Sequence, residues 1–215
     1  MIINGSPRVQ KLSNTDKILT KLIEGMKEAD PELTYEMYCI SDRKQWDPAR
    51  AAFECNNVIL IALPLYFECV PGLLLEFLGT LSPKHDDTKI SFVLQSGFAE
   101  ASQLRCGEEF LSKLPSKLGC TYGGTLIKGD NFSFRYMNEE QTAKPLGAYK
   151  TMGGVYIKNG GFDCEEARKF AGPEYFGFFL RGILTFVFNV FARKGFEKMA
   201  EGQGCTKPLA YRPYD

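Results

Sequence analysis

The chain has few of the residues that usually mark a metal site or a catalytic triad. It carries one histidine, His85, and its seven cysteines stand singly, with no pair separated by only two residues. A zinc or iron–sulfur site built on paired cysteines is therefore not expected, and we predict no bound metal. His85 falls in the polar segment 82–88, which favours a solvated loop histidine over a catalytic one. Adjacent acids such as Glu108 and Glu109 do not face each other on a helix, so they are poor candidates for paired-carboxylate catalysis.

The composition also has no excess of positive or of negative charge. Lys and Arg number 26, and Asp and Glu number 26 as well. This balance suggests neither a nucleic-acid footprint nor an anionic-membrane patch, so we expect a small-molecule or protein partner and no nucleic acid. An odd number of scattered cysteines is typical of reduced thiols. The chain also enters its first strand without a basic stretch and an apolar segment before it, so we expect a cytoplasmic protein.

The beginning of the chain organises the rest. Ile2 and Ile3 form a strand stub, a turn rich in Gly, Ser and Asn follows, and apolar residues recur at helical spacing from Ile18 to Met26. Such a turn leaves the first N–H groups of the helix free, which predicts a seat for a phosphate. The polar side chains at this end are Ser6, Arg8, Ser13, Asn14 and Thr15. A simpler alternative is an ordinary N-cap by Ser13 or Asn14.

Strand and helix patterns alternate along the next part of the chain. The dinucleotide motif GxGxxG and the P-loop motif GxxxxGK[ST] are both absent. The expected strands after the first cover 33–40, 57–63, 89–94 and 120–128, and the expected helices cover 47–54, a segment starting at 73, 101–118 and 145–158. The run 57–63 is continuously apolar, as in a central parallel strand buried on both faces. Gly123 and Gly124 suggest a bulge in the last strand. These patterns predict an α/β fold with a doubly wound five-stranded parallel sheet in the order 2-1-3-4-5.

Two further loops follow strands of this sheet. The segment 64–72 is held between Pro64 and Pro71, and it presents Tyr66 and Phe67 where no core place is expected for them. The segment 95–100 contains Gly97, which lets the backbone approach a flat ligand. Open α/β sheets bind ligands at the carboxyl ends of their strands, so we expect these loops to meet the first one at one edge. A rigid connector is the alternative for 64–72.

The three loops resemble those of a known family. NGSPR with SNT after the first strand, PLYFECVPG after the third and QSGF after the fourth are similar to the FMN-binding loops of the flavodoxin-like NAD(P)H-dependent FMN reductases and quinone oxidoreductases. The tail, with GGFD, AGPE, ARKG and a final YRPYD, resembles the C-terminal extension of a bacterial subgroup. The resemblance implies a flavodoxin-like FMN-binding domain over 1–160 and a helical extension over 161–215.

The resemblance also implies a cofactor, a reaction and a set of site residues. The implied cofactor is FMN, with NAD(P)H as co-substrate, and the implied function is electron transfer to a small acceptor such as a quinone or free flavin. An electron carrier serving a protein partner is the alternative, and a flavin-free scaffold or a peripheral membrane protein is a third. The residues implied to bind FMN are Ser6, Arg8, Ser13, Asn14 and Thr15 at the phosphate, Pro64, Leu65, Tyr66 and Phe67 along the isoalloxazine, and Gln95, Ser96, Gly97 and Phe98 at its polar edge. Because the flavin carries the redox chemistry, no catalytic side chain is expected.

The segment 176–191 is apolar almost all round. It is shorter than the roughly 20 apolar residues that cross a bilayer, and Arg181 and Asn189 interrupt it, so no membrane span is expected. Two interpretations stay open: a helix packed on the same domain, or a subunit contact that also covers the flavin. Because one sheet layer covers only one face of such a helix, we expect a homodimer with this helix at or beside the contact.

Overall fold

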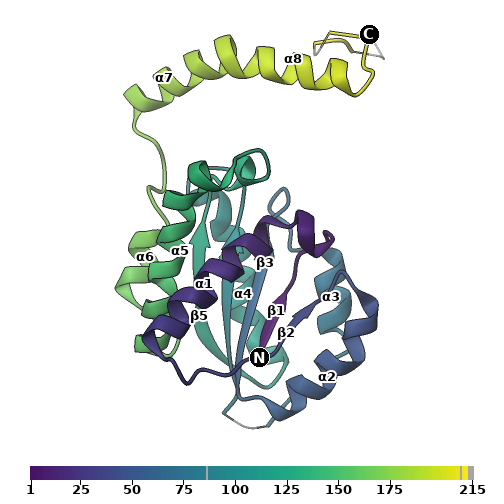
Figure 1. Ribbon diagram of the computed structural model, residues 1–215, viewed down its shortest axis with the longest axis vertical. Helices are drawn as coiled ribbons and strands as arrows, with labels where there is room; N and C mark the ends of the chain where they lie inside the picture. The colour runs from purple at the N-terminus through teal and green to yellow at the C-terminus, as the bar shows by residue number, and fades with distance from the viewer. Residues whose placement is uncertain (86, 209, 213–215) are drawn as a thin grey trace. The chain divides into compact units, whose positions relative to one another are not determined.

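The computed structural model describes residues 1–85, 87–208 and 210–212, without the side chains of Lys11 and Arg135 (Figure 1). The chain divides into two compact units, Met1–Glu174 and Tyr175–Asp215. The segment 161–174, expected in the C-terminal extension, lies within the first unit.

The first unit is built on one five-stranded parallel sheet. Its strands are β1 (Ile2–Asn4), β2 (Met37–Cys39), β3 (Val58–Pro64), β4 (Lys89–Gln95) and β5 (Thr121–Lys128). Their order is β2-β1-β3-β4-β5, and every neighbouring pair is parallel. This is the flavodoxin-like order, so the predicted fold class is confirmed.

Helices cover both faces of the sheet. They are α1 (Asn14–Ala29), α2 (Trp46–Cys55), α3 (Gly72–Leu78), α4 (Ser102–Lys117), α5 (Glu139–Asn159) and α6 (Glu165–Phe170), with short 3-10 turns at Gln10–Leu12, Arg43–Gln45 and Phe132–Arg135. The helix expected from Pro145 begins six residues earlier. Asn138 and Gln141 form a capping box there, and this start signal outweighs the proline in the second turn.

Alternate residues of the central strand β3 belong to two hydrophobic cores, one on each face of the sheet. Ile59, Ile61 and Leu63 of β3 pack with α2, α3 and α4, whereas Leu60 and Ala62 pack with α1, α5 and α6. Figure 1 shows α1 and α5 side by side over their face of the sheet. Burial on both faces explains why this strand is a continuous apolar run.

The glycine pair in β5 forms the expected bulge. Ile90 pairs with Tyr122 and Phe92 pairs with Thr125, so one residue of β4 lies opposite two glycines. Gly124 has a φ of 90°, and a Cβ there would lie 2.3 Å from the backbone of residues 162 and 163. Only glycine allows both the bulge and the close crossing of the chain that leads into α6.

The second unit contains one continuous helical segment. It contains α7 (Phe178–Val187), a π turn (Phe188–Ala192) and α8 (Arg193–Gly202), so the helix expected to end at 191 continues to 202. Among the residues that the structure describes, no helix is long and apolar enough to cross a bilayer.

Candidate functional site

Four loops leave the carboxyl edge of the sheet, at the ends of β1, β3, β4 and β5. The strand order reverses between β1 and β3: β2 follows β1 on one side of the sheet, and the later strands β3, β4 and β5 follow on the other. Open α/β sheets place their ligands in the crevice at such a point. This edge of the sheet is therefore the candidate site.

The loop after β1 is ordered by two short side-chain contacts. The backbone N–H of Ser6 donates to Oδ1 of the buried Asn4 at 3.1 Å, and Oγ of Ser6 accepts from the N–H of Arg8 at 3.3 Å. A serine hydroxyl that accepts one bond still has its own proton to donate. The guanidinium of Arg8 is exposed and forms no ion pair with any described residue. The loop thus offers one hydroxyl donor and one cation.

The start of α1 combines a cap with unused polar groups. Oγ of Ser13 accepts from the N–H of Asp16 at 3.3 Å, so Ser13 is the N-cap of α1. An ordinary N-cap was the simpler alternative for this stretch of the sequence. The backbone N–H groups of Asn14 and Thr15 donate to no protein acceptor in the described part of the chain. Oδ1 of Asn14 is buried and also has no partner, although its amide nitrogen donates to the carbonyl of Asn131 at 2.7 Å. A buried acceptor of this kind fits a ligand hydroxyl.

Asp16 is a neighbour that the sequence analysis did not consider. Its Oδ1 accepts from Nε2 of Gln10 at 2.9 Å and from Nδ2 of Asn4 at 3.4 Å. A carboxylate in the first turn favours the helix start, but it also lowers the affinity of the same place for an anion. The sequence signal for Asp16 is an acidic residue three positions after a serine N-cap, in the first turn of the helix.

The loop after β3 is a tight two-residue hairpin. Tyr66 and Cys69 form a small antiparallel bridge with backbone bonds of 3.0 and 2.9 Å. Between them, Phe67 and Glu68 both have positive φ, 46° and 66°. Such turns favour Asn and Gly, so two larger residues store strain there, as often happens at ligand sites. Phe67 is 87% exposed at the tip, and Tyr66 is also exposed.

Pro64 and Leu65, the first two residues expected along the isoalloxazine, are buried, unlike Tyr66 and Phe67. Pro64 ends β3 and is buried, and Leu65 belongs to the core cluster beneath the loop. The N–H of Leu65 donates to the carbonyl of Gln95 at 2.7 Å, which joins this loop to the next. At these two positions only the backbone is available to a ligand.

The loop after β4 is joined to the first loop and to the last. Nε2 of the buried Gln95 donates to Oγ1 of Thr15 at 3.4 Å. Oγ of Ser96 accepts from the N–H of Phe98 at 3.2 Å, repeating the arrangement at Ser6. A Cβ on Gly97 would lie 3.1 Å from Cβ of Phe132, so the backbone passes close to that ring. Phe98 itself is about half exposed.

The loop after β5 connects the others and was missed by the sequence analysis. The N–H of Asn131 donates to the carbonyl of Ser96 at 3.0 Å. Its side-chain amide donates to the carbonyl of Lys128 and to the hydroxyl of Tyr149, both at 2.9 Å. Because its own carbonyl accepts from Asn14, this one buried residue links three loops. The polar GDN sequence directly after a strand is the signal from which this loop could have been found.

Titratable groups below the edge stay neutral. Burial raises the pKa of Tyr149 well above its usual range, with a smaller opposing effect from its hydrogen bond to Asn131. Burial also raises the pKa of the Cys39 thiol, with Asp16 and Asp42 adding to the effect. Neither group supplies a charge at neutral pH. Among the described residues, no group of three His, Cys, Asp or Glu could hold a metal ion.

Together these groups fit a ligand with an anionic end, a polyol and a flat aromatic part. The free N–H groups at the start of α1 and Arg8 suit the anion. The unpartnered oxygen of Asn14 suits a hydroxyl, and the exposed rings of Tyr66 and Phe98 suit an aromatic system. FMN has these three parts.

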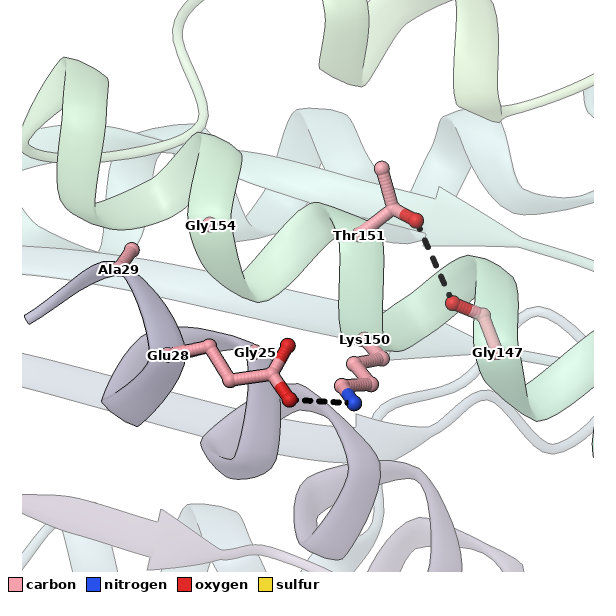
Figure 2. A pocket seen from close by; sticks show the side chains of 7 residues that line it. All are labelled: Gly25, Glu28, Ala29, Gly147, Lys150, Thr151 and Gly154. Atoms are coloured by element: carbon pink, nitrogen blue, oxygen red, sulfur yellow. Dashed lines mark hydrogen bonds and ion pairs between the residues drawn. The ribbon is translucent and has the colours of Figure 1, made fainter.

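A hollow away from the candidate site lies between α1 and α5 (Figure 2). It has a volume of about 310 Å³ and is lined by Gly25, Glu28, Ala29, Gly147, Lys150, Thr151 and Gly154. Lys150 Nζ pairs with Glu28 Oε1 at 2.6 Å, so the two charges neutralise each other. The remaining walls are small residues with little to fix a ligand.

The comparisons with known proteins agree with the fold. No family model matches the chain, and no curated protein does. Among solved structures it is similar to an FMN-dependent NADH-azoreductase from Bacillus anthracis in complex with FMN, with 13% identity, a TM-score of 0.53, and coverage of 73% of this chain and 97% of that one. It is also similar to an NAD(P)H:quinone oxidoreductase from Methanothermobacter marburgensis, with 14% identity, a TM-score of 0.54, and coverage of 71% and 95%. At such low identity these likenesses establish a shared fold.

Proposed function

We propose that the chain is an FMN-dependent oxidoreductase that takes a hydride from NAD(P)H and passes electrons to a small acceptor such as a quinone or free flavin. The observation that carries the proposal is the linked set of loops at the carboxyl edge, which leaves an exposed arginine, free N–H groups and exposed aromatic rings at one place. The similarity to an FMN-dependent NADH-azoreductase and to an NAD(P)H:quinone oxidoreductase supports it.

In this proposal each loop has its own task. Ser6, Arg8 and the N–H groups of Asn14 and Thr15 bind the phosphate, and Ser13 keeps the helix start in place. Oδ1 of Asn14 accepts from a ribityl hydroxyl. Tyr66 and Phe67 lie along the ring system above the backbone of Pro64 and Leu65, whereas Gln95, Ser96, Gly97 and Phe98 hold its polar edge. FMN rather than FAD is expected, because the site offers one anion seat.

The bound flavin supplies the hydride and electron chemistry. The chain's own residues bind it, orient it and exclude water from one side of it. Neither a triad nor a paired carboxylate is needed for this reaction.

Purification and one anaerobic titration test the proposal. The purified protein is expected to be yellow, to release FMN on denaturation, and to be bleached by NADH or NADPH. Reoxidation is then followed with a panel of quinones, free flavin and azo compounds. A colourless protein that does not bind added FMN would contradict the proposal. Flavin that is bound but not reduced by either nicotinamide would favour the electron-carrier alternative.

A further inference from the structure

The helical segment from Phe178 to Gly202 carries a large apolar surface. Taken by itself, the second unit buries none of its helical residues. Phe179 is 81% exposed and Phe186 is 65% exposed. Apolar surface of this extent marks a contact with another molecule or with lipid.

Polar residues on α7 and the π turn occupy one narrow stripe. Arg181, Thr185 and Asn189 recur every four residues and so lie on one side of the helix. The apolar side chains cover roughly half of the circumference or more. They are Phe179, Leu180, Ile183, Leu184, Phe186, Val187, Phe188, Val190 and Phe191, with Phe188 at the edge next to Arg181. Phe178, the first residue of α7, lies on the side of the polar stripe.

The π turn carries the apolar side into α8. In an unbroken α-helix, Phe196 would point roughly a quarter of a turn away from Phe188, eight residues before it. The wider π turn at Phe188–Ala192 changes that phase, and the two ring centroids lie 6.3 Å apart. One apolar side therefore continues along the whole segment, and the Arg193–Glu197 ion pair lies on α8 outside it.

Charge is not spread evenly over the chain. The segment 175–215 holds six Lys or Arg against three Asp or Glu, although the whole chain is balanced. No acidic residue occurs from 175 to 196, and Arg193, Lys194 and Lys198 follow the apolar part directly. The neutral total, which suggested no anionic-membrane patch, hides this local excess of positive charge.

We propose that the segment 178–202 lies in the interface of an anionic lipid bilayer, with its apolar side in the acyl boundary and its basic residues at the headgroups. A broad apolar side, aromatic residues and a basic polar side are the features of helices that lie on membranes without crossing them. The expected homodimer is the competing occupant. The charge balance of the segment disfavours it, because Arg181, Arg193, Lys194 and Lys198 outnumber the two acids Glu197 and Glu201, so two such helices carry like net charge. The proposal does not depend on the flavin site.

Flotation of the full-length protein with vesicles tests the proposal. Vesicles of phosphatidylcholine containing phosphatidylglycerol are expected to carry the protein upward, and pure phosphatidylcholine vesicles are expected to carry less. Lys194→Gln with Lys198→Gln should lower the ratio of bound to free protein on the anionic vesicles by more than about tenfold. Phe186→Asp should lower it by at least about tenfold on both kinds of vesicle.

Asn189→Asp is the matched control, because it adds the same charge on the polar stripe. It should lower binding much less than Phe186→Asp does. Phe179→Asp gives a second change on the apolar side. Equal binding by Phe186→Asp and the unchanged protein would overturn the proposal. A stable particle of twice 24.2 kDa in light scattering that does not float with either vesicle would overturn it as well, in favour of the homodimer.

Discussion

Single residues of the candidate site divide into those that build the loops and those left for a ligand. Ser6 and Ser96 each hold the N–H group two residues ahead, and Asn131 joins three loops. Arg8 and the oxygen of Asn14 have no such structural task. Substitutions of the loop-building residues should therefore lower the stability of the fold, whereas substitutions of Arg8 or Asn14 should weaken ligand binding.

Arg8→Ala tests the proposed phosphate contact. One charge-assisted hydrogen bond contributes about 1.5–3 kcal/mol, so the Kd for FMN should rise by roughly ten- to a hundredfold. Thermal unfolding without FMN should stay unchanged, because the side chain is exposed and unpaired among the described residues. Arg168→Ala is the control, since it removes an exposed guanidinium from α6 that, as far as the structure describes the chain, pairs only with the exposed Asp163. An unchanged Kd, measured by flavin fluorescence, would place the phosphate elsewhere.

Glu68→Gly tests the strain in the hairpin after β3. The φ of 66° costs a residue with a Cβ about 1 kcal/mol, which glycine avoids. The free energy of unfolding should therefore rise by about that amount. Glu140→Gly, in the first turn of α5, should instead lower it, because glycine disfavours a helix. A destabilised Glu68→Gly protein in urea unfolding would mean that the glutamate makes a contact outweighing the strain.

At the scale of elements, the contact between α1 and α5 is set by two glycines. A Cβ on Gly25 would lie 1.7 Å from the carbonyl oxygen of Lys150, and one on Gly153 would lie 2.0 Å from that of Leu22. The backbones therefore approach closely at both positions. This contact fixes α1, whose first turn belongs to the candidate site.

Gly153→Ala should accordingly destabilise the protein. The added methyl meets backbone rather than a flexible side chain, so a loss of about 1–3 kcal/mol is expected. Gly147→Ala on the same helix has no atom within 4 Å of the new Cβ, and it should gain about 0.5–1 kcal/mol. Chemical denaturation of both variants measures the difference. Equal stabilities would show that the helices can move apart without cost.

At the scale of the whole molecule, the last residues of the first unit are tied to α4. The N–H groups of Ala101 and Ser102 donate to the carbonyls of Pro173 and Glu174 at 3.0 and 3.3 Å. These bonds supply the cap that α4 lacks in its own side chains. Arg105 pairs with Glu174 as well. The chain is thereby held next to the loop after β4.

This tie should depend on pH. The Arg105 hydrogen bond lowers the pKa of Glu174 below its unfolded value of 4.5. The stabilisation is therefore complete above that pH and is lost as the pH falls through the lower folded pKa. Because the pair is exposed, it contributes at most about 1 kcal/mol. Glu174→Gln should lower the Tm slightly at pH 7 and not at pH 3, whereas the control Glu32→Gln, at an exposed position outside the helices, should show no such pH dependence. Equal shifts at both pH values would mean that charge is not the cause.

Several features of this protein follow from the sequence by itself. The continuous apolar runs around Ile61 and Phe92 require burial on both faces, which only a central strand of a covered parallel sheet provides. The spacing of Ile18, Leu22 and Met26 sets the buried side of α1. Because these patterns depend on near neighbours in the chain, they predicted the fold class, the strand order and the bulge at Gly124. The assignment of individual FMN-binding residues stays a prediction.

Other features were decided only by the tertiary structure. Asn131 matters because Asn14 and Ser96, far away in the sequence, come to its side. Phe67 and Glu68 form a turn without glycine because Tyr66 and Cys69 are already paired, so tertiary context overrides local preference. The close approach at Gly153 likewise depends on a helix more than a hundred residues earlier in the chain. Contacts between distant segments leave no periodic pattern, and for that reason the sequence could not reveal them.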